Sequence, residues 1–186
     1  MKQLVDLGIV VQEFLESHGL NFCFIGGLAL QRWGENRFTG DVDLSVLTGF
    51  ENEERVADLL LSRFAGRISG AKDHALRHRV LLLECDGIGI DVGFAGFDYE
   101  IEMMRRASAF EFLEGLWLRT CSAEDLVVMK AFASRPRDWE DIRGILIRQE
   151  GKLDWALILS ALGPLAELKE DPAILPTLET LRRGEG

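Results

Sequence analysis

Apolar positions in the N-terminal third of the chain alternate between helical spacing and the shorter patterns of strands. Apolar residues recur every three or four positions over 4–15 and over 51–64, which predicts two helices with one apolar face each. A continuous apolar run at 22–25 and an alternation of polar and apolar residues at 41–47 predict two strands. This part of the chain is therefore expected to mix helices with a sheet.

An abrupt turn is predicted at Gly26 and Gly27, which lie between the first apolar run and a helical segment that reaches Trp33. Two glycines at a strand-to-helix turn let backbone N–H groups approach a phosphate closely, and the helix N-terminus adds a partial positive charge. The turn is thus a candidate phosphate-binding site.

The middle of the chain predicts further strands. Segments 80–85 and 88–94 are apolar and meet at Asp86 and Gly87, a dipeptide that favours a tight hairpin turn. The stretch before them, 72–79, is rich in charged residues and is interpreted as a polar connection. The other short strands expected here are 107–112 and 116–120.

From Ser122 onward the pattern becomes helical. Ser122 is followed three residues later by a carboxylate and then by an apolar run, which is typical of a helix N-cap. Pro136 ends this helix, and Asp138 is interpreted as the cap of the next one, which runs to Arg148. The remaining helical segments expected are 153–168 and 173–183.

These patterns together predict an α/β (α+β) fold in two parts. Residues 1–121 are expected to form a short mixed sheet flanked by helices, and residues 122–186 a C-terminal helical region that packs on this core and closes one side of a cleft.

Two of the predicted strands carry carboxylates on one face, because side chains of a strand alternate between its faces. Asp41 and Asp43 share one face of segment 41–47. In segment 88–94, Asp91 shares its face only with glycines, which leaves room for a ligand against the strand. If the strands are neighbours, three carboxylates converge and repel one another unless a cation neutralises them. The pattern predicts a site for Mg²⁺ or Mn²⁺, which prefer oxygen ligands.

A cation held by carboxylates beside a phosphate-binding turn is typical of enzymes that transfer phosphoryl or nucleotidyl groups. Asp41 and Asp43 are predicted to bridge two ions, of which one lowers the pKa of an acceptor hydroxyl and the other offsets charge on the leaving pyrophosphate. Asp91 is expected to ligate the ion on the acceptor side and is the candidate to take the proton.

Residues 25–44 resemble the nucleotidyltransferase superfamily, whose pattern is a Gly-Gly or Gly-Ser turn, a short helix and Asp-x-Asp on the next strand. They are most similar to the AbiEii-like branch, bacterial nucleotidyltransferases that act as toxins of toxin–antitoxin systems. Arg37 and Thr39 match the Arg and Thr that often precede Asp-x-Asp in that branch, and Asp91 matches the third carboxylate of the superfamily. Many members carry Ser at the second turn position, where Gly27 of this chain supplies only its backbone.

The resemblance continues at Lys130 and the residues after it, which are similar to a Lys-then-Arg-x-x-Asp stretch of the same proteins and extend the match to about residue 147. It implies an NTP substrate, a hydroxyl acceptor that is a protein, a tRNA end or a small molecule, and an antitoxin protein as partner. The nucleotide-binding residues that it implies are Gly26, Gly27, Arg37, Thr39 and Lys130, and Asp138 and Asp141 are acceptor-side or structural candidates.

Each of these residues also has a plainer structural interpretation. The carboxylates fit a solvated edge strand, the glycines a simple tight turn, and Thr39 a turn or cap. Lys130 fits a surface lysine, and Asp141 fits an ion pair with Arg137 or Arg148 on its own helix. At the level of the whole chain, the alternative is a non-catalytic nucleotide-binding or protein-interaction module on the same fold. Retention of all three carboxylates favours the enzyme, because a binding module gains nothing from clustering like charges.

Composition narrows the partners. The 21 Lys and Arg residues against 31 Asp and Glu residues give a formal charge of −10, which argues against a broad nucleic-acid surface and leaves only a local basic patch. The members of this patch are Arg135, Arg137, Arg143 and Arg148. No apolar run approaches the ~20 residues of a membrane span, and three scattered cysteines fit a reducing compartment, so a cytoplasmic protein is expected.

Overall fold

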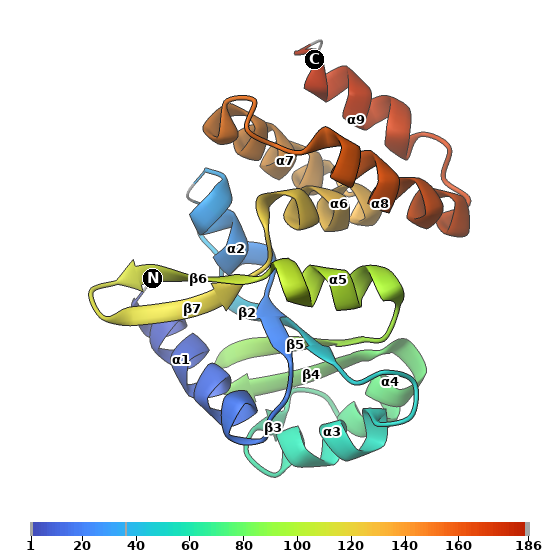
Figure 1. Ribbon diagram of the computed structural model, residues 1–186. Helices are drawn as coiled ribbons and strands as arrows, with labels where there is room; N and C mark the ends of the chain where they lie inside the picture. Colours follow the sequence, from blue (N-terminus) through green and yellow to red (C-terminus); the bar gives the residue numbers. More distant parts are fainter. Residues whose placement is uncertain (1, 36, 185–186) are drawn as a thin grey trace. The chain divides into compact units, whose positions relative to one another are not determined.

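The computed structural model describes residues 2–35 and 37–184, which divide into two compact units (Figure 1). The first unit comprises Met1–Leu28 and Phe38–Cys121, and the second comprises Ala29–Arg37 and Ser122–Gly186. Helix α2 (Gly26–Trp33) therefore begins in the first unit and ends in the second.

The first unit is built on a mixed sheet of seven strands in the order β3-β4-β5-β2-β1-β7-β6. Strand β2 runs parallel to β5 and β1 parallel to β7, and the other neighbours are antiparallel. This agrees with the predicted α/β class. The strands are β1 (Phe22–Phe24), β2 (Asp41–Leu47), β3 (Ala65–Gly66), β4 (Val80–Cys85), β5 (Ile88–Ala95), β6 (Ser108–Leu113) and β7 (Leu116–Thr120).

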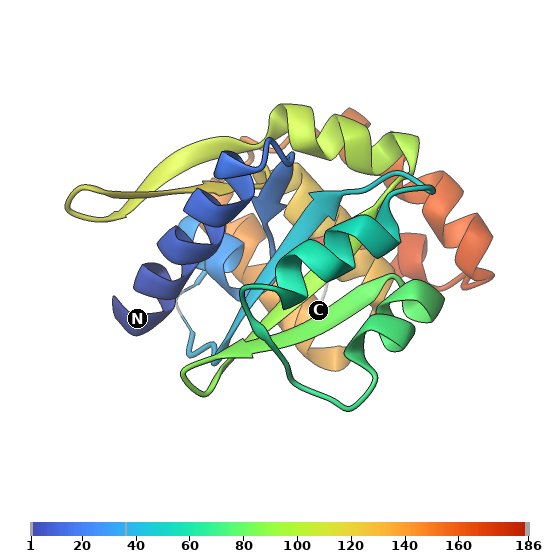
Figure 2. The same cartoon turned by 90° about the horizontal axis from the view of Figure 1, so that it is seen from below.

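Helices α1 (Lys2–Ser17), α3 (Glu53–Leu61) and α4 (Ala71–His78) contribute to one apolar core with one face of this sheet, and Figure 2 shows α1 and α3 in front of its central strands. The even-numbered residues of β2 and β5 face this core, where Val42 and Ile90 are fully buried and Ile88 is partly buried. Each buried aliphatic side chain of this kind contributes about 1.5–3 kcal/mol. The odd-numbered residues, which include the predicted carboxylates, lie on the opposite face.

The hairpin between β4 and β5 has the predicted turn, and both of its central residues are left-handed, with φ +50° at Asp86 and +77° at Gly87. The interpretation of 72–79 as a polar connection is wrong, because α4 covers most of it. The buried side of α4 consists of two alanines four residues apart, Ala71 and Ala75. Such small side chains give the sequence no clear apolar periodicity from which this helix could be predicted. Helix α5 (Asp98–Arg106) and strand β3 were also not predicted.

The second unit is helical beyond the end of α2. It contains α6 (Ala123–Ala133), α7 (Pro136–Gln149), α8 (Trp155–Lys169) and α9 (Ile174–Arg182). Ser122 caps α6 as predicted, since its hydroxyl accepts a hydrogen bond from the Asp125 N–H at 3.1 Å. Asp138 is not the N-cap of α7 but its third residue, and its carboxylate reaches back to the N–H of Arg135 at 3.3 Å.

Helix α7 also holds the segment that follows α2. Arg148 donates to the carbonyl of Gly34 at 2.9 Å, and Gln149 donates to the carbonyl of Trp33 at 2.8 Å. None of the helices in the described part of the chain is long and apolar enough to cross a membrane.

Candidate active site

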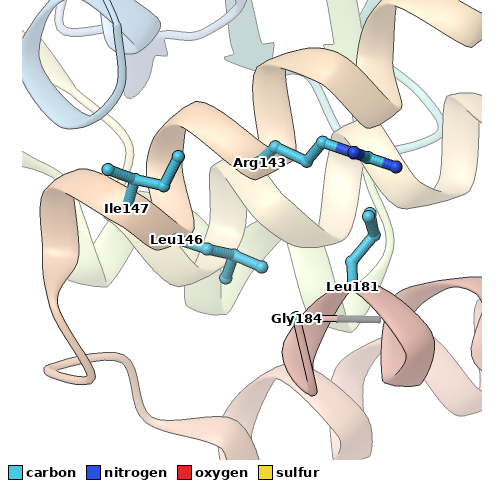
Figure 3. A pocket seen from close by; sticks show the side chains of 5 residues that line it. All are labelled: Arg143, Leu146, Ile147, Leu181 and Gly184. Atoms are coloured by element: carbon cyan, nitrogen blue, oxygen red, sulfur yellow. The ribbon is translucent and has the colours of Figure 1, made fainter. Parts of the chain in front are cut away.

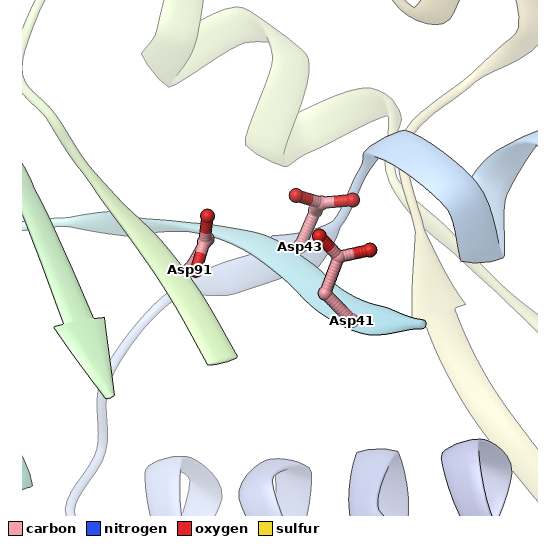
Figure 4. Close-up of side chains that lie close together, drawn as sticks. All are labelled: Asp41, Asp43 and Asp91. Carbon is pink, nitrogen blue, oxygen red and sulfur yellow. The ribbon is translucent and has the colours of Figure 1, made fainter. Parts of the chain in front are cut away.

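The three predicted carboxylates come together on the open face of the sheet. The parallel register of β2 and β5 places Asp43 opposite Asp91, and Asp41 opposite Gly89. One oxygen of each of Asp41, Asp43 and Asp91 lies within 4.8 Å of the others, and Figure 4 shows the side chains on one side of the two strands. Within residues 2–35 and 37–184, no other group of three acidic, histidine or cysteine side chains comes this close.

This spacing fits a divalent cation. Oxygen ligands of Mg²⁺ lie about 2.0–2.1 Å from the ion, so opposite ligands are separated by about 4.2 Å. At least two of the three pairs among three such ligands are adjacent and closer than opposite ones, so the three oxygens would draw together on binding an ion, and all of them are carboxylates, the hard donors that Mg²⁺ and Mn²⁺ prefer.

The electrostatics of Asp91 also favour a cation. Burial raises the pKa of Asp91 above its ordinary value, and the nearby charge of Asp41 raises it further, while the charge and hydrogen bond of Arg67 oppose this shift. Arg67 therefore only partly offsets the cost of the Asp91 charge, and an added divalent cation would offset it more fully.

The glycine turn is in direct contact with this cluster. Gly26 has a φ of +50°, a backbone conformation that favours glycine. A side chain at this position would also overlap the carboxylate of Asp43, so there are two separate reasons for glycine here. The N–H of Gly27, in the first turn of α2, donates to Oδ2 of Asp43 at 3.3 Å. The turn thus places the N-terminus of a helix beside the acidic cluster.

Thr39 completes this part of the site. A side chain at position 27 would overlap the side chain of Thr39, whose hydroxyl donates to Oδ1 of Asp41 at 3.0 Å. The space that a serine at position 27 would need is therefore already taken by a threonine. Gly27 and Thr39 fit each other, and the hydroxyl of Thr39 lies beside the turn.

Sequence reasoning missed Arg67, which contacts the cluster from the other side. Its Nη2 lies 2.6 Å from Oδ1 of Asp91. The glycine face of β5, interpreted from the sequence as bare, is partly covered by this side chain, because a Cβ at Gly89 would overlap Nη1 of Arg67. Arg67 follows a strand of only two residues, which is too short to give a pattern that would place it.

The other predicted nucleotide-binding residues, Arg37 and Lys130, lie in the second unit and share a carboxylate. Arg37 donates from Nε and Nη2 to the two oxygens of Asp141, at 2.8 and 2.9 Å. Lys130 lies 2.5 Å from Oδ2 of Asp141 and 3.4 Å from Oδ1 of Asp138. Arg135 pairs with Asp138 at 2.6 Å. We call these five residues the ionic network.

The partners of Asp141 differ from those expected, since they are Arg37 and Lys130 and not a neighbour on α7. Burial alone would raise the pKa of Asp141, but the hydrogen bonds and charges of Arg37 and Lys130 outweigh it and hold the pKa below its ordinary value. For Asp138, burial is likewise outweighed by Arg135 and Lys130, which lower its pKa. Both carboxylates are therefore charged and internally neutralised.

A shallow pocket of about 190 Å³ lies elsewhere in the second unit, between α7 and the end of α9 (Figure 3). Its lining is mainly apolar, and Arg143 is the one residue of the predicted basic patch that reaches it. It contains none of the predicted catalytic carboxylates.

Comparisons with known proteins agree with this arrangement. The family model described as the nucleotidyl transferase AbiEii toxin of type IV toxin–antitoxin systems matches residues 10–183. A comparison with curated protein sequences finds no match.

Solved structures share the fold at low sequence identity. The crystal structure of ANT(2″)-Ia with adenylyl-2″-tobramycin has a TM-score of 0.59 and 18% identity, over 91% of this chain and 99% of that one. The solution structure of ANT(2″)-Ia gives 0.55 and 17%, over 96% and 97%. An antigenic nucleotidyltransferase-like protein from Paracoccidioides brasiliensis gives 0.56 and 17%, over 96% and 93%. Since the family model spans nearly the whole sequence, this chain belongs to the AbiEii nucleotidyl transferase toxin family and is a nucleotidyltransferase.

Proposed function

We propose that this protein transfers a nucleoside monophosphate from an NTP to a hydroxyl group of an acceptor, with Mg²⁺ or Mn²⁺ held by Asp41, Asp43 and Asp91. The observation that carries this proposal is the convergence of three carboxylate oxygens within 4.8 Å beside a glycine turn that opens a helix. The cluster does not serve the core, since it lies on the face opposite the buried side of the sheet.

The residues of the site divide the work of such a transfer. A bound divalent cation would supply Lewis-acid assistance to the acceptor hydroxyl and charge neutralisation for the phosphates. The N-terminus of α2, which starts at Gly26, would receive the β- and γ-phosphates, with the N–H of Gly27 exchanging its hydrogen bond to Asp43 for one to a phosphate. The acceptor oxygen forms a bond to the α-phosphorus, the bond to the β-phosphate oxygen breaks, pyrophosphate leaves, and Asp91 takes the hydroxyl proton.

For Arg37 and Lys130, which the sequence predicted to contact the triphosphate, we propose a positioning role instead, because Asp141 binds both side chains. Arg37 ends the segment of the second unit that follows α2, and its paired hydrogen bonds to Asp141 fix that segment on α7. Of the two acceptor-side or structural candidates, Asp141 then anchors this segment, and Asp138 binds Lys130 and Arg135.

For the acceptor we propose a protein, a tRNA end or a small molecule, and for the biological role a toxin that an antitoxin protein restrains in the cytoplasm. The formal charge of −10 favours a compact acceptor over a long nucleic acid. The adenylyl-tobramycin complex of ANT(2″)-Ia is a case in which this fold binds a nucleotidylated small molecule.

The test is transfer of label from each of the four NTPs, supplied with Mg²⁺ or Mn²⁺ and a cell extract. Asp43→Asn is expected to lower transfer at least about a thousandfold, because it removes charge from the centre of the cluster but keeps an oxygen for the Gly27 N–H. Asp58→Asn is the matched control, since Asp58 is an exposed carboxylate that pairs with Lys72.

Transfer that survives Asp43→Asn would contradict this site. Thermal stabilisation by NTP without any transfer, in the wild-type protein, would support the non-catalytic binding module instead.

A further inference from the structure

Arg67 lies at the end of a row of side chains that crosses the open face of the sheet. The β3–β4 pairing places Gly66 beside Leu83, and the N–H of Arg67 donates to the carbonyl of Leu82 at 3.0 Å, which extends this pairing by one residue. Leu82 is paired with Asp91, and Asp91 with Asp43. Arg67 therefore reaches over Leu82 to the acidic cluster.

The chain makes room for this contact. The guanidinium lies over Gly89, where any Cβ would overlap it, and its Nη2 meets Oδ1 of Asp91 at 2.6 Å. The pair is partly open to solvent, with 33% of the Arg67 side chain and 29% of the Asp91 side chain exposed. The ion pair is thus formed but not locked inside the protein.

Arg67 and a divalent cation compete for the carboxylate of Asp91. The cation needs an oxygen of Asp91 to complete its three carboxylate ligands, and a guanidinium already bound there is a like charge within a few ångströms. Binding of the cation therefore weakens the Arg67–Asp91 pair, and the pair weakens binding of the cation.

The sheet order also places Arg67 and the glycine turn on opposite flanks of the triad. The glycine turn follows β1, on one flank of the triad, whereas Arg67 comes from the end of β3, beyond β4 on the other flank. In an in-line displacement the nucleophile and the leaving pyrophosphate are on opposite sides of the phosphorus. If pyrophosphate leaves toward the glycine turn, the acceptor arrives on the flank of Asp91 and Arg67.

We propose that Arg67 is an acceptor-side positioning residue that holds Asp91 in the cation-free protein and releases it when a divalent cation binds. This inference rests on the cation site of the proposed function. The displaced guanidinium stays on the acceptor flank, where it can contact an incoming polar or anionic group.

The first test measures the binding of Mn²⁺ alone by calorimetry. Arg67→Met keeps the aliphatic stem over Leu82 and removes the charge, so its Mn²⁺ affinity is expected to rise about tenfold over that of the wild type. Gly89→Ala keeps the charge but moves it off Asp91, and is expected to raise the affinity in the same direction. Lys72→Met removes an equal charge that pairs with Glu54 and Asp58, and should stay within about twofold.

An unchanged or weaker Mn²⁺ affinity in Arg67→Met would overturn the role of Arg67. If, in that case, the wild type binds Mn²⁺ and Asp43→Asn does not, the cation site stands and only the Arg67 inference fails. Absence of Mn²⁺ binding in every variant at millimolar metal would overturn both.

The second test follows Arg67 itself. The side-chain N–H resonances of Arg67 in NMR spectra can be assigned by comparison with Arg67→Lys. When Mg²⁺ saturates the site, the chemical shifts of these resonances are expected to move to those of a guanidinium that has no hydrogen bond to Asp91. A signal that does not change on saturation would show that the pair persists beside the cation, and would contradict release. Thermal unfolding of Arg67→Met without metal checks that the variant is folded.

Discussion

The protein contains two groups of charged side chains that look alike in sequence and differ in chemistry. In the first unit, three carboxylates gather on an open face, and burial together with the charge of Asp41 raises the pKa of Asp91. In the second unit, the ionic network surrounds two carboxylates with three cations, and the pKa values of Asp138 and Asp141 are lowered.

The difference distinguishes a candidate cation-binding site, the triad, from a group of residues that stabilises the fold, the ionic network. The three carboxylates of the triad are partly exposed and repel one another, so the triad is suited to receive a cation from solvent. The network supplies its own cations, and the side chains of Lys130, Asp138 and Asp141 are only 4–7% exposed, which leaves little access for a ligand. We therefore expect substitutions in the triad to act on activity, and those in the network to act first on stability.

The largest expected effect on stability comes from Lys130→Met. This change leaves Asp138 and Asp141 buried without the lysine that they share, so the free energy of unfolding is expected to fall by about 3–5 kcal/mol. Denaturant unfolding measures it, with Lys152→Met as the control at an exposed lysine, for which a change below about 0.5 kcal/mol is expected. A Lys130→Met variant of normal stability that no longer binds NTP would instead assign Lys130 to the triphosphate site. It would contradict the distinction between the triad as a binding site and the network as a stabilising group.

A smaller and pH-dependent effect is expected from Asp141→Asn. The amide keeps the shape of the side chain but loses its charge-assisted bonds to Arg37 and Lys130, which costs about 2 kcal/mol at pH 7. Because the pKa of Asp141 is lowered in the folded state, this stabilisation is fully present above the unfolded pKa of about 3.9, and is lost as the pH falls through the folded value.

Urea unfolding at a series of pH values measures this dependence. The difference between wild type and Asp141→Asn should be constant from about pH 5 to pH 8 and shrink below about pH 4. The triad should respond differently, because the pKa of Asp91 is raised and its protonation weakens Mn²⁺ binding at a higher pH than the one at which the network fails. A stability difference that persists in strong acid would contradict the charged form of Asp141.

The triad could be predicted from the sequence because its geometry depends on a local rule. Alternation along a strand puts Asp41 and Asp43 on one face and Asp91 on the glycine face, and only the neighbour relation of β2 and β5 had to be assumed. That assumption is confirmed by the parallel register. The Asp86-Gly87 hairpin was predictable for the same reason, since the turn type depends on two adjacent residues.

The partners of these residues could not be predicted, because they are set by long-range packing. Arg37 and Asp141 are 104 residues apart, and their pairing depends on how the segment after α2 lies on α7. Arg67 is 24 residues from Asp91 and reaches it only because β3 adds to the edge of β4. Opposite charges are common in the sequence, and nothing in their spacing selects these pairs.

The smallest expected effect tests the hydroxyl of Thr39, an uncharged group that holds Asp41 of the triad. Thr39 donates a hydrogen bond from its hydroxyl to the charged carboxylate of Asp41, and such a bond contributes about 1.5 kcal/mol, so Thr39→Val is expected to lower transfer and Mn²⁺ affinity about tenfold with little change in stability. Thr39→Ser keeps the hydroxyl and should stay close to wild type. A loss in Thr39→Ser that Thr39→Val does not share would assign the effect to the methyl group packed against Gly27, and the hydroxyl would have no part in positioning Asp41.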